Sequence, residues 1–142
     1  MLLEKIQQAK DTILSAFQPR AEVGIILGTG LGGLIKSIDI EASLDYKDIP
    51  GFVDPTVMDH EGKLIYGKLE GKSVLCLQGR FHYYEGYTME EITFPVRVLK
   101  ALGCEYLFVS NACGGINTKF KAKDIMLITD HINLLGQNPL IG

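Results

Sequence analysis

The chain has 142 residues, a length typical of one globular domain. Apolar residues make up 46% of it and charged residues 22%, which excludes an intrinsically disordered chain. The net charge of −3 argues against binding to nucleic acid, which needs a basic surface. No apolar run reaches the roughly 18 residues of a membrane span, and the first residues lack the pattern of a signal peptide. We therefore expect a cytoplasmic protein that binds neither nucleic acid nor membranes.

The three cysteines, Cys76, Cys104 and Cys113, are odd in number and lack the spacing of a zinc site. Such a set is typical of a reducing compartment, in which disulfides are rare. We expect neither a disulfide framework nor a bound metal.

The first half of the chain contains a predicted helix and a predicted buried strand. Residues 2–17 have apolar side chains at helical spacing, and Pro19 follows them. Residues 23–27 form a continuous apolar run, typical of a strand covered on both faces. A glycine-rich loop, 28–33, follows directly, and residues 41–62 show no regular pattern.

The second half is predicted to contain a hairpin, a helix and two further strands. Thr88 and Glu91 have the spacing of a capping box, so a helix is expected from Thr88 to Leu102. Pro95 must kink this helix or mark its start. The expected hairpin strands are 64–69 and 74–77, and the later strands are 106–110 and 125–128.

This alternation predicts an α/β fold with a mixed, largely parallel central sheet flanked by helices. Ligands of such sheets bind beyond the carboxyl ends of the strands. Small or polar residues follow four of the predicted strands, so we expect these four loops to line one cleft: Gly28-Thr29, Gly79-Arg80, Asn111-Ala112 and Asp130-His131.

The glycine loop allows three interpretations. Gly28, Gly30 and Gly33 satisfy the GxGxxG pattern of dinucleotide-binding proteins, and Asp48 has the spacing of the acid that such sites require. No apolar strand precedes Asp48, which weakens that interpretation. A simple tight turn is the second possibility. We favour the third, an anion cradle, in which backbone N–H groups and the Thr29 hydroxyl approach a phosphate.

Arg80, His82 and Tyr84 alternate along one segment, so an extended backbone would point them the same way. Arginine offers a planar fork suited to phosphate, histidine a donor that can be charged near neutral pH, and tyrosine a flat face for a sugar. An exposed polar loop explains the same residues equally well.

The remaining candidates have plain explanations beside the functional ones. His60 lies in a turn region and is either solvated or functional. His131 after Asp130 could form an acid–base pair, although a histidine that closes a strand is more often structural. Cys113 lacks a neighbouring base, which favours a small packing residue over a nucleophile. Asn111 and Gly114 are better candidates for the cleft wall.

Taken together, the segments closely resemble the trimeric class of purine nucleoside phosphorylases, in its bacterial form. The resemblance covers nearly all of the chain after residue 20. It rests on these stretches: GIILGTGLGGL (24–34), QGRFHYYEGY (78–87), TFPVRVLKALG (93–103), NACGGIN (111–117) and DIMLITDHINLLGQNPLIG (124–142).

The resemblance implies roles for individual residues. It places phosphate on the hydroxyl of Thr29, the side chains of Arg80 and His82 and the backbone N–H of Ala112. His60 matches the family's histidine over the phosphate site, and the catalytic set is then His82, Arg80 and His60. The residues expected near ribose or the nucleoside are Tyr84, Asn111 and Gly114.

The implied reaction is the phosphorolysis of a purine ribonucleoside or deoxyribonucleoside, with inorganic phosphate as co-substrate and no metal or organic cofactor. Members of the family are usually much longer, and their purine-recognising residues lie in a later segment. We therefore expect residues 1–142 to be the N-terminal part of one domain, which forms a homotrimer when complete. The alternatives are a non-catalytic phosphate- or nucleotide-binding module and a relative of methylthioadenosine phosphorylase.

Overall fold

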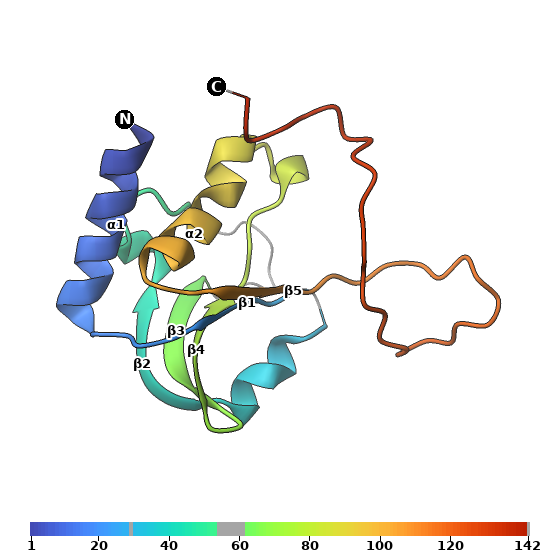
Figure 1. Ribbon diagram of the computed structural model, residues 1–142, viewed down its shortest axis with the longest axis horizontal. Coiled ribbons are helices and arrows are strands. Elements are labelled where there is room, and N and C mark those ends of the chain that lie inside the picture. The colour runs from blue at the N-terminus through green and yellow to red at the C-terminus, as the bar shows by residue number, and fades with distance from the viewer. Residues whose placement is uncertain (29, 54–61, 142) are drawn as a thin grey trace.

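The computed structural model describes residues 1–28, 30–53 and 62–141 (Figure 1). Helices alternate with strands, as the sequence predicts. In chain order the elements are α1 (Leu2–Ala16), β1 (Val23–Ile26), the 3-10 helix η1 (Gly32–Ser37), β2 (Asp39–Asp45), the 3-10 helix η2 (Tyr46–Asp48), β3 (Lys63–Leu69), β4 (Lys72–Gln78), the 3-10 helix η3 (Tyr83–Glu85), α2 (Met89–Ala101) and β5 (Tyr106–Val109).

The strands form one five-stranded sheet in the order β2-β3-β4-β1-β5. Strand β1 is parallel to both of its neighbours, and Val23 lies opposite Val74 of β4 and Tyr106 of β5. The β3–β4 hairpin and the β2–β3 pair are antiparallel. The predicted mixed sheet and hairpin are therefore confirmed. Because β4, β1 and β5 run in the same direction, their carboxyl ends meet at one edge of the sheet.

Both faces of the central strands β1, β3 and β4 are covered. Helices α1 and α2 lie against the same face (Figure 1), where Ile13 and Val98 are buried with Leu75. On the opposite face, Ile65 and Cys76 are buried in a second cluster, to which η1 contributes half-buried apolar side chains. Successive residues of a strand point to opposite faces, which explains why neighbours in β3 and β4 belong to different clusters.

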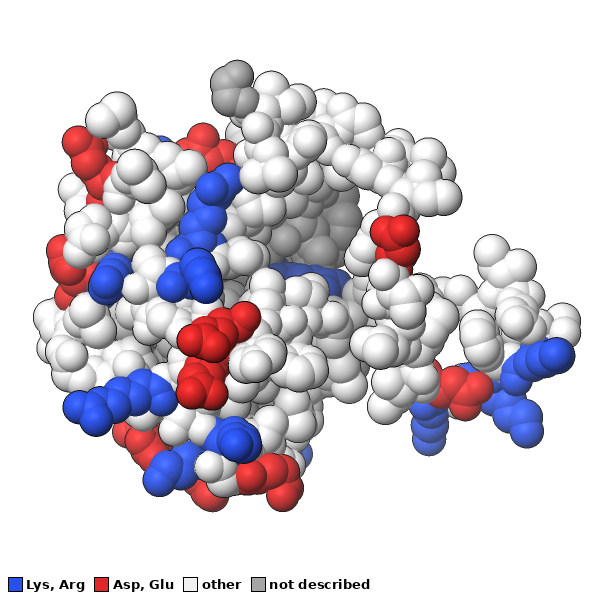
Figure 2. All heavy atoms as spheres, viewed as in Figure 1, with Lys and Arg blue, Asp and Glu red and all other residues white. Residues whose placement is uncertain are grey.

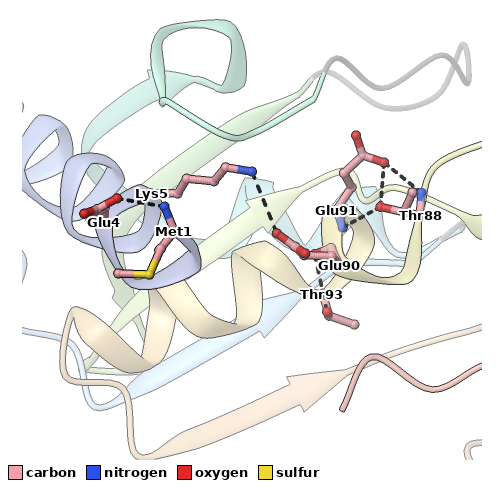
Figure 3. A network of polar contacts seen from close by, with 7 residues as sticks. All are labelled: Met1, Glu4, Lys5, Thr88, Glu90, Glu91 and Thr93. Carbon is pink, nitrogen blue, oxygen red and sulfur yellow. Dashed lines mark hydrogen bonds and ion pairs between the residues drawn. The ribbon is translucent and has the colours of Figure 1, made fainter. Parts of the chain in front are cut away.

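The predicted capping box at the start of α2 is present (Figure 3). The Thr88 backbone N–H and hydroxyl donate to the Glu91 carboxylate at 2.7 and 2.8 Å, and these bonds lower the pKa of Glu91. An exposed ion pair of 3.8 Å between Lys5 and Glu90 links α1 to α2. Pro95 lies inside α2, so it does not mark the start of the helix.

One strand was not predicted, and one expected strand is absent. Residues 39–45 form the edge strand β2, part of which falls in the least regular stretch of the sequence, because a mostly exposed edge strand needs no apolar stripe. Residues 125–128, predicted as a strand, form none. A strand needs a neighbour to accept and donate its backbone hydrogen bonds, and no described strand pairs with this segment; Ile125 is 99% exposed.

Residues 111–141 contain no helix or strand, and much of this segment extends away from the sheet and helices (Figure 1). Strand β5, which precedes it, is an edge strand whose four side chains are all exposed. The sheet therefore has an open edge with exposed apolar side chains, among them Phe108 at 63%. Cys113 is exposed as well, so the expectation that it is a packing residue is wrong.

Acidic and basic side chains are interspersed over the face of the molecule in Figure 2. In the part of the chain that the structure describes, no helix is both long and apolar enough to span a membrane. The same described residues hold no group of three or more His, Cys, Asp or Glu side chains suited to a metal ion.

Candidate anion-binding site

The ends of the three strands that precede predicted loops meet at the carboxyl edge of the sheet. Gly28 follows β1, Arg80 follows β4 and Ser110 follows β5. The Gly28 backbone N–H donates to the Ser110 hydroxyl at 3.0 Å, and Arg80 Nη1 donates to the Ser110 carbonyl at 2.6 Å. These bonds join segments that lie 82 and 30 residues apart in the sequence. The convergence of these three strand ends is thus confirmed.

A chain of hydrogen bonds fixes the guanidinium and an imidazole beside it. Arg80 Nε donates to His82 Nε2 at 3.0 Å, which makes Nε2 an acceptor. The other ring nitrogen, Nδ1, then carries the proton and donates to Glu85 Oε1 at 2.6 Å. The side chains of His82 and Glu85 are only 14% and 3% exposed. Glu85 therefore sets both the orientation and the tautomer of the imidazole.

The local sequence explains this arrangement. His82 has an extended backbone and precedes η3, and its own N–H donates to Glu85 Oε1 at 2.8 Å. Gly86, with φ of +96°, ends the short helix in the left-handed conformation. The spacing of His82 and Glu85 is that of a capping box, a signal that could have revealed the role of Glu85 from the sequence.

Tyr84 lies against His82, although the extended segment that its spacing assumed is wrong. The two rings stack with centroids 4.7 Å apart and planes 16° from parallel. The expected alternation assumed an extended segment, whereas Tyr84 belongs to the 3-10 helix η3. Tyr84 is 77% exposed, so its outer face is open to a ligand.

Tyr46, which the sequence did not point to, stabilises the turn before Arg80. Its hydroxyl donates to the Gly79 carbonyl at 2.8 Å. The ring is 1% exposed and packs edge-on against Phe52 and Phe81, and this burial raises the pKa of Tyr46. Gly79 has φ of +107°, which favours glycine at this turn.

Gly28 is required because nothing larger fits. A Cβ at Gly28 would lie 2.3 Å from the Ser110 carbonyl oxygen and 3.3 Å from Arg80 Nη1. The missing side chain thus allows β5 and the guanidinium to approach the end of β1. The Gly28 amide itself is taken by the Ser110 hydroxyl, so the expected anion cradle does not include this amide.

Several predicted site residues lie elsewhere. Thr29 and His60 fall outside the described residues. Asn111, Ala112 and Gly114 follow Ser110 directly and are exposed. They are thus near the joined strand ends in the sequence. They belong to no helix or strand that would fix their orientation.

The fourth expected loop does not follow a strand, because 125–128 is not one. Asp130 Oδ1 accepts the backbone N–H of His131 at 2.8 Å, a local bond that favours the structural interpretation of this histidine. A separate cavity of about 180 Å³ is lined by α1, α2 and residues 51–53, and neither Arg80 nor His82 lines it.

The geometry defines a class of protein. An arginine held by two acceptors, beside an oriented histidine, is a candidate anion-binding site. It lies beyond the carboxyl ends of parallel strands, where α/β sheets bind their ligands. The chain belongs to the phosphorylase superfamily, whose family model matches residues 22–142.

Similar proteins agree with this assignment. The chain is 54% identical to purine nucleoside phosphorylase 1 of Bacillus subtilis over 139 residues, which are 98% of this chain and 51% of that protein. It is 48% identical to purine nucleoside phosphorylase of Rattus norvegicus, and this match covers 98% of this chain and 49% of that protein.

Among solved structures, isoform 2 of purine nucleoside phosphorylase from Schistosoma mansoni, in complex with cytosine and ribose-1-phosphate, has a TM-score of 0.89. It is 42% identical, and the match covers 98% of this chain and 50% of that one. The chain thus spans about half the length of the relatives it matches. The resemblance to purine nucleoside phosphorylases is confirmed for the matched half.

Proposed function

We propose that this chain supplies the phosphate-binding part of an enzyme that carries out reversible phosphorolysis of purine ribonucleosides and deoxyribonucleosides. The products are the free purine base and ribose or deoxyribose 1-phosphate. The observation that carries the proposal is the chain of hydrogen bonds from Ser110 through Arg80 and His82 to Glu85 at the joined strand ends. The similarity to purine nucleoside phosphorylases supports the choice of reaction.

Arg80 binds the phosphate in this proposal. Its contacts with Ser110 and His82 use Nη1 and Nε, and the remaining N–H groups are available to oxygen atoms of an anion. A guanidinium that is already held in place loses little side-chain freedom when the anion arrives. Fixing the phosphate beside the sugar removes much of the entropic cost of bringing the two reactants together.

His82 completes the phosphate site. We assign the ring a phosphate contact, because His82 Nε2 lies 3.0 Å from Arg80 Nε and the ring thus lies beside the guanidinium that binds the anion. The Glu85 carboxylate at Nδ1 fixes the orientation of the ring. The phosphate then lies against the positively charged guanidinium, close to the cationic C1′ of an oxocarbenium-like transition state.

Residues around this centre take the remaining roles. We assign phosphate contacts to the Ala112 backbone N–H, the Thr29 hydroxyl and His60. Tyr84, Asn111 and Gly114 contact the sugar or nucleoside, and the exposed face of the Tyr84 ring supports its part. Phosphate is the only co-substrate that this scheme requires, so we propose that the reaction needs no metal or organic cofactor.

For the whole protein, we propose a homotrimer that acts in purine salvage in the cytoplasm. Residues 1–142 form the first part of a single phosphorylase domain in this proposal. The extent of the match to one half of longer relatives supports it. Sedimentation of the whole protein tests the trimer, and a monomer that turns over nucleosides at full rate would contradict it.

The test is phosphate-dependent release of hypoxanthine from inosine by the purified protein. We expect release that requires phosphate, is lost in Arg80→Ala and is only partly restored in Arg80→Lys, because lysine keeps the charge but lacks the fork. Arg20→Ala is the matched control, since Arg20 is exposed and far from Arg80 in the sequence. Release that continues in Arg80→Ala would overturn the assignment of the site.

A second candidate function is a non-catalytic phosphate- or nucleotide-binding module. The match of this chain to only half of each relative favours it for the 142 residues alone. Saturable binding of phosphate, lost in Arg80→Ala, without cleavage of inosine would support the module. If methylthioadenosine is cleaved in preference to inosine, the relative of methylthioadenosine phosphorylase is the better description.

A further inference from the structure

The last hydrogen bonds between β1 and β5 depart from the pattern of a parallel ladder. The Ser110 N–H donates to the Ile26 carbonyl at 3.2 Å, which continues the ladder by one residue beyond β5. In a regular ladder the next bond would run from the Gly28 N–H to the Ser110 carbonyl. The Gly28 N–H donates to the Ser110 hydroxyl instead, at 3.0 Å.

The Ser110 hydroxyl therefore takes the place of its own carbonyl in the ladder. It accepts from Gly28 and lies 3.3 Å from the Ile26 carbonyl, to which it donates its proton. Both hydrogen-bonding functions of the hydroxyl are thus used within the sheet. The Ser110 carbonyl is left to accept Arg80 Nη1, at the short distance of 2.6 Å.

This exchange fixes the guanidinium of Arg80 at two points. One nitrogen is held by the Ser110 carbonyl from β5, and Nε is held by His82 on the same segment as Arg80. Two anchors on different nitrogens determine the plane of the fork, and the plane decides which oxygen atoms of an anion it can reach. A long side chain without them would have many rotamers to lose on binding.

We propose that Ser110 is a positioning residue for phosphate binding: its hydroxyl replaces its carbonyl in the ladder and so releases that carbonyl to orient Arg80. The inference rests on the proposed function, in which Arg80 binds phosphate. Ser110 does not touch the anion and acts through the guanidinium. It differs from a purely structural serine because the group that it frees is the one that holds Arg80.

The proposal predicts what happens when the hydroxyl is removed. In Ser110→Ala the Gly28 N–H turns to the carbonyl of residue 110, its acceptor in a regular ladder, and competes there with Arg80. The ladder bond is restored, so the stability of the fold changes little, while the guanidinium loses its alignment. Ser110→Thr keeps a hydroxyl at the same atom position. Ser73→Ala is the matched control, because Ser73 is half-buried near the start of β4, whereas Arg80 follows the end of that strand.

The experiment titrates inorganic phosphate into the 142-residue chain and measures the unfolding midpoint of each variant in urea. We expect Ser110→Ala to weaken phosphate binding by about tenfold, the effect of one lost hydrogen bond to a charged group, at an unchanged midpoint. Ser110→Thr and Ser73→Ala should bind as the unaltered chain does. A lowered midpoint with unchanged phosphate affinity in Ser110→Ala would overturn the proposal, as would equal losses in Ser110→Ala and Ser110→Thr.

A second readout separates this proposal from the proposed function. The NMR resonance of the Arg80 Nε–H reports the position of the guanidinium without any ligand. We expect it to shift in Ser110→Ala and to stay in place in Ser110→Thr and Ser73→Ala. If the unaltered chain binds no phosphate, the proposed function fails, and this resonance still decides the role of Ser110: an unmoved signal in Ser110→Ala contradicts it.

Discussion

Residues 1–110 and residues 111–141 contain similar apolar side chains, but only the first region buries many of them in a core. In the first region Leu75 is fully buried, and Ile65 is 2% exposed. In the second, Leu127 is 88% exposed and Ile132 is 86% exposed. An apolar sequence therefore does not make a core by itself. It needs an element that presents the side chains on one face and a second layer to cover them.

The two regions also differ in the reach of their polar contacts. In the first region the site is built by bonds between distant segments, such as Gly28 to Ser110 across 82 residues. In the second region the side-chain bonds are mostly local, as between Lys121 and Asp124. Long-range bonds fix a site in three dimensions, whereas local bonds shape only a turn. This is why Arg80 and His82 are held in place and Asn111 and Ala112 are not.

Thiol labelling gives the largest expected contrast. Cys76 and Cys104 are buried in the first region, and burial raises the pKa of their thiols to about 12 and about 11. Cys113 is exposed in the second. Because the thiolate is the reactive form, a thiol reagent at pH 8 should modify Cys113 alone in the folded protein. Mass spectrometry locates the label, and modification of Cys76 before unfolding would contradict the buried core.

A pair of leucine variants tests the packing directly. Leu75→Ala leaves a cavity in the core and should lower the free energy of unfolding by about 2–5 kcal/mol. Leu127→Ala removes the same atoms from an exposed side chain and should change it by less than about 0.5 kcal/mol. Urea unfolding measures both. Similar losses in the two variants would show that the second region is packed in solution.

A pair of glycine variants tests the site in the same way. A Cβ at Gly28 would collide with the Ser110 carbonyl, whereas a Cβ at Gly114 meets nothing within 4 Å. Gly28→Ala should therefore cost about 1–3 kcal/mol of stability and abolish saturable phosphate binding. Gly114→Ala should leave stability and binding unchanged. If Gly28→Ala binds phosphate normally, the close approach of β5 and Arg80 to this glycine does not govern the site.

The smallest effect is expected at the start of α2. The hydrogen bonds from Thr88 lower the pKa of Glu91 in the folded protein. A carboxyl with a lowered pKa contributes stability above its unfolded pKa and loses it as the pH falls through the folded value. Glu91→Gln should thus lower stability by only about 0.3 kcal/mol at pH 7, since the half-buried side chain remains accessible to water, which screens its charge.

Comparison of the Glu91→Gln variant with the unaltered chain at pH 3 supplies the control for this effect. The carboxyl of the unaltered chain takes up its proton as the pH falls, so the difference between the two urea midpoints should be smaller at pH 3 than at pH 7. A difference of the same size at both pH values would mean that the charge of Glu91 is not its cause.

Much of the fold follows from local sequence signals. The apolar run of β1, the capping box of Thr88 and the turn between β3 and β4 are all properties of neighbouring residues, so they could be predicted. Strand β2 could not be, because its order comes from pairing with β3. The strand expected at 125–128 failed for the converse reason: its apolar pattern has no described neighbour to pair with.

The same difference between local and long-range signals explains which site residues could be predicted. The spacing of Arg80, His82 and Tyr84 predicted that they could act together, and they do lie in contact. Ser110 and Tyr46 were missed, since their importance lies in bonds to residues 30 and 33 positions away. Glu85 was within reach of sequence reasoning, because its bond to His82 spans three residues.

The central claim is that phosphate binds at the joined ends of β1, β4 and β5 through Arg80, and an NMR titration of the labelled chain with inorganic phosphate tests it most directly. We predict saturable shifts of the Arg80 Nε–H and of the backbone amides of His82 and Ser110, all lost in Arg80→Ala. Shifts that do not saturate, that scatter over surface lysines or that persist in Arg80→Ala would contradict the claim.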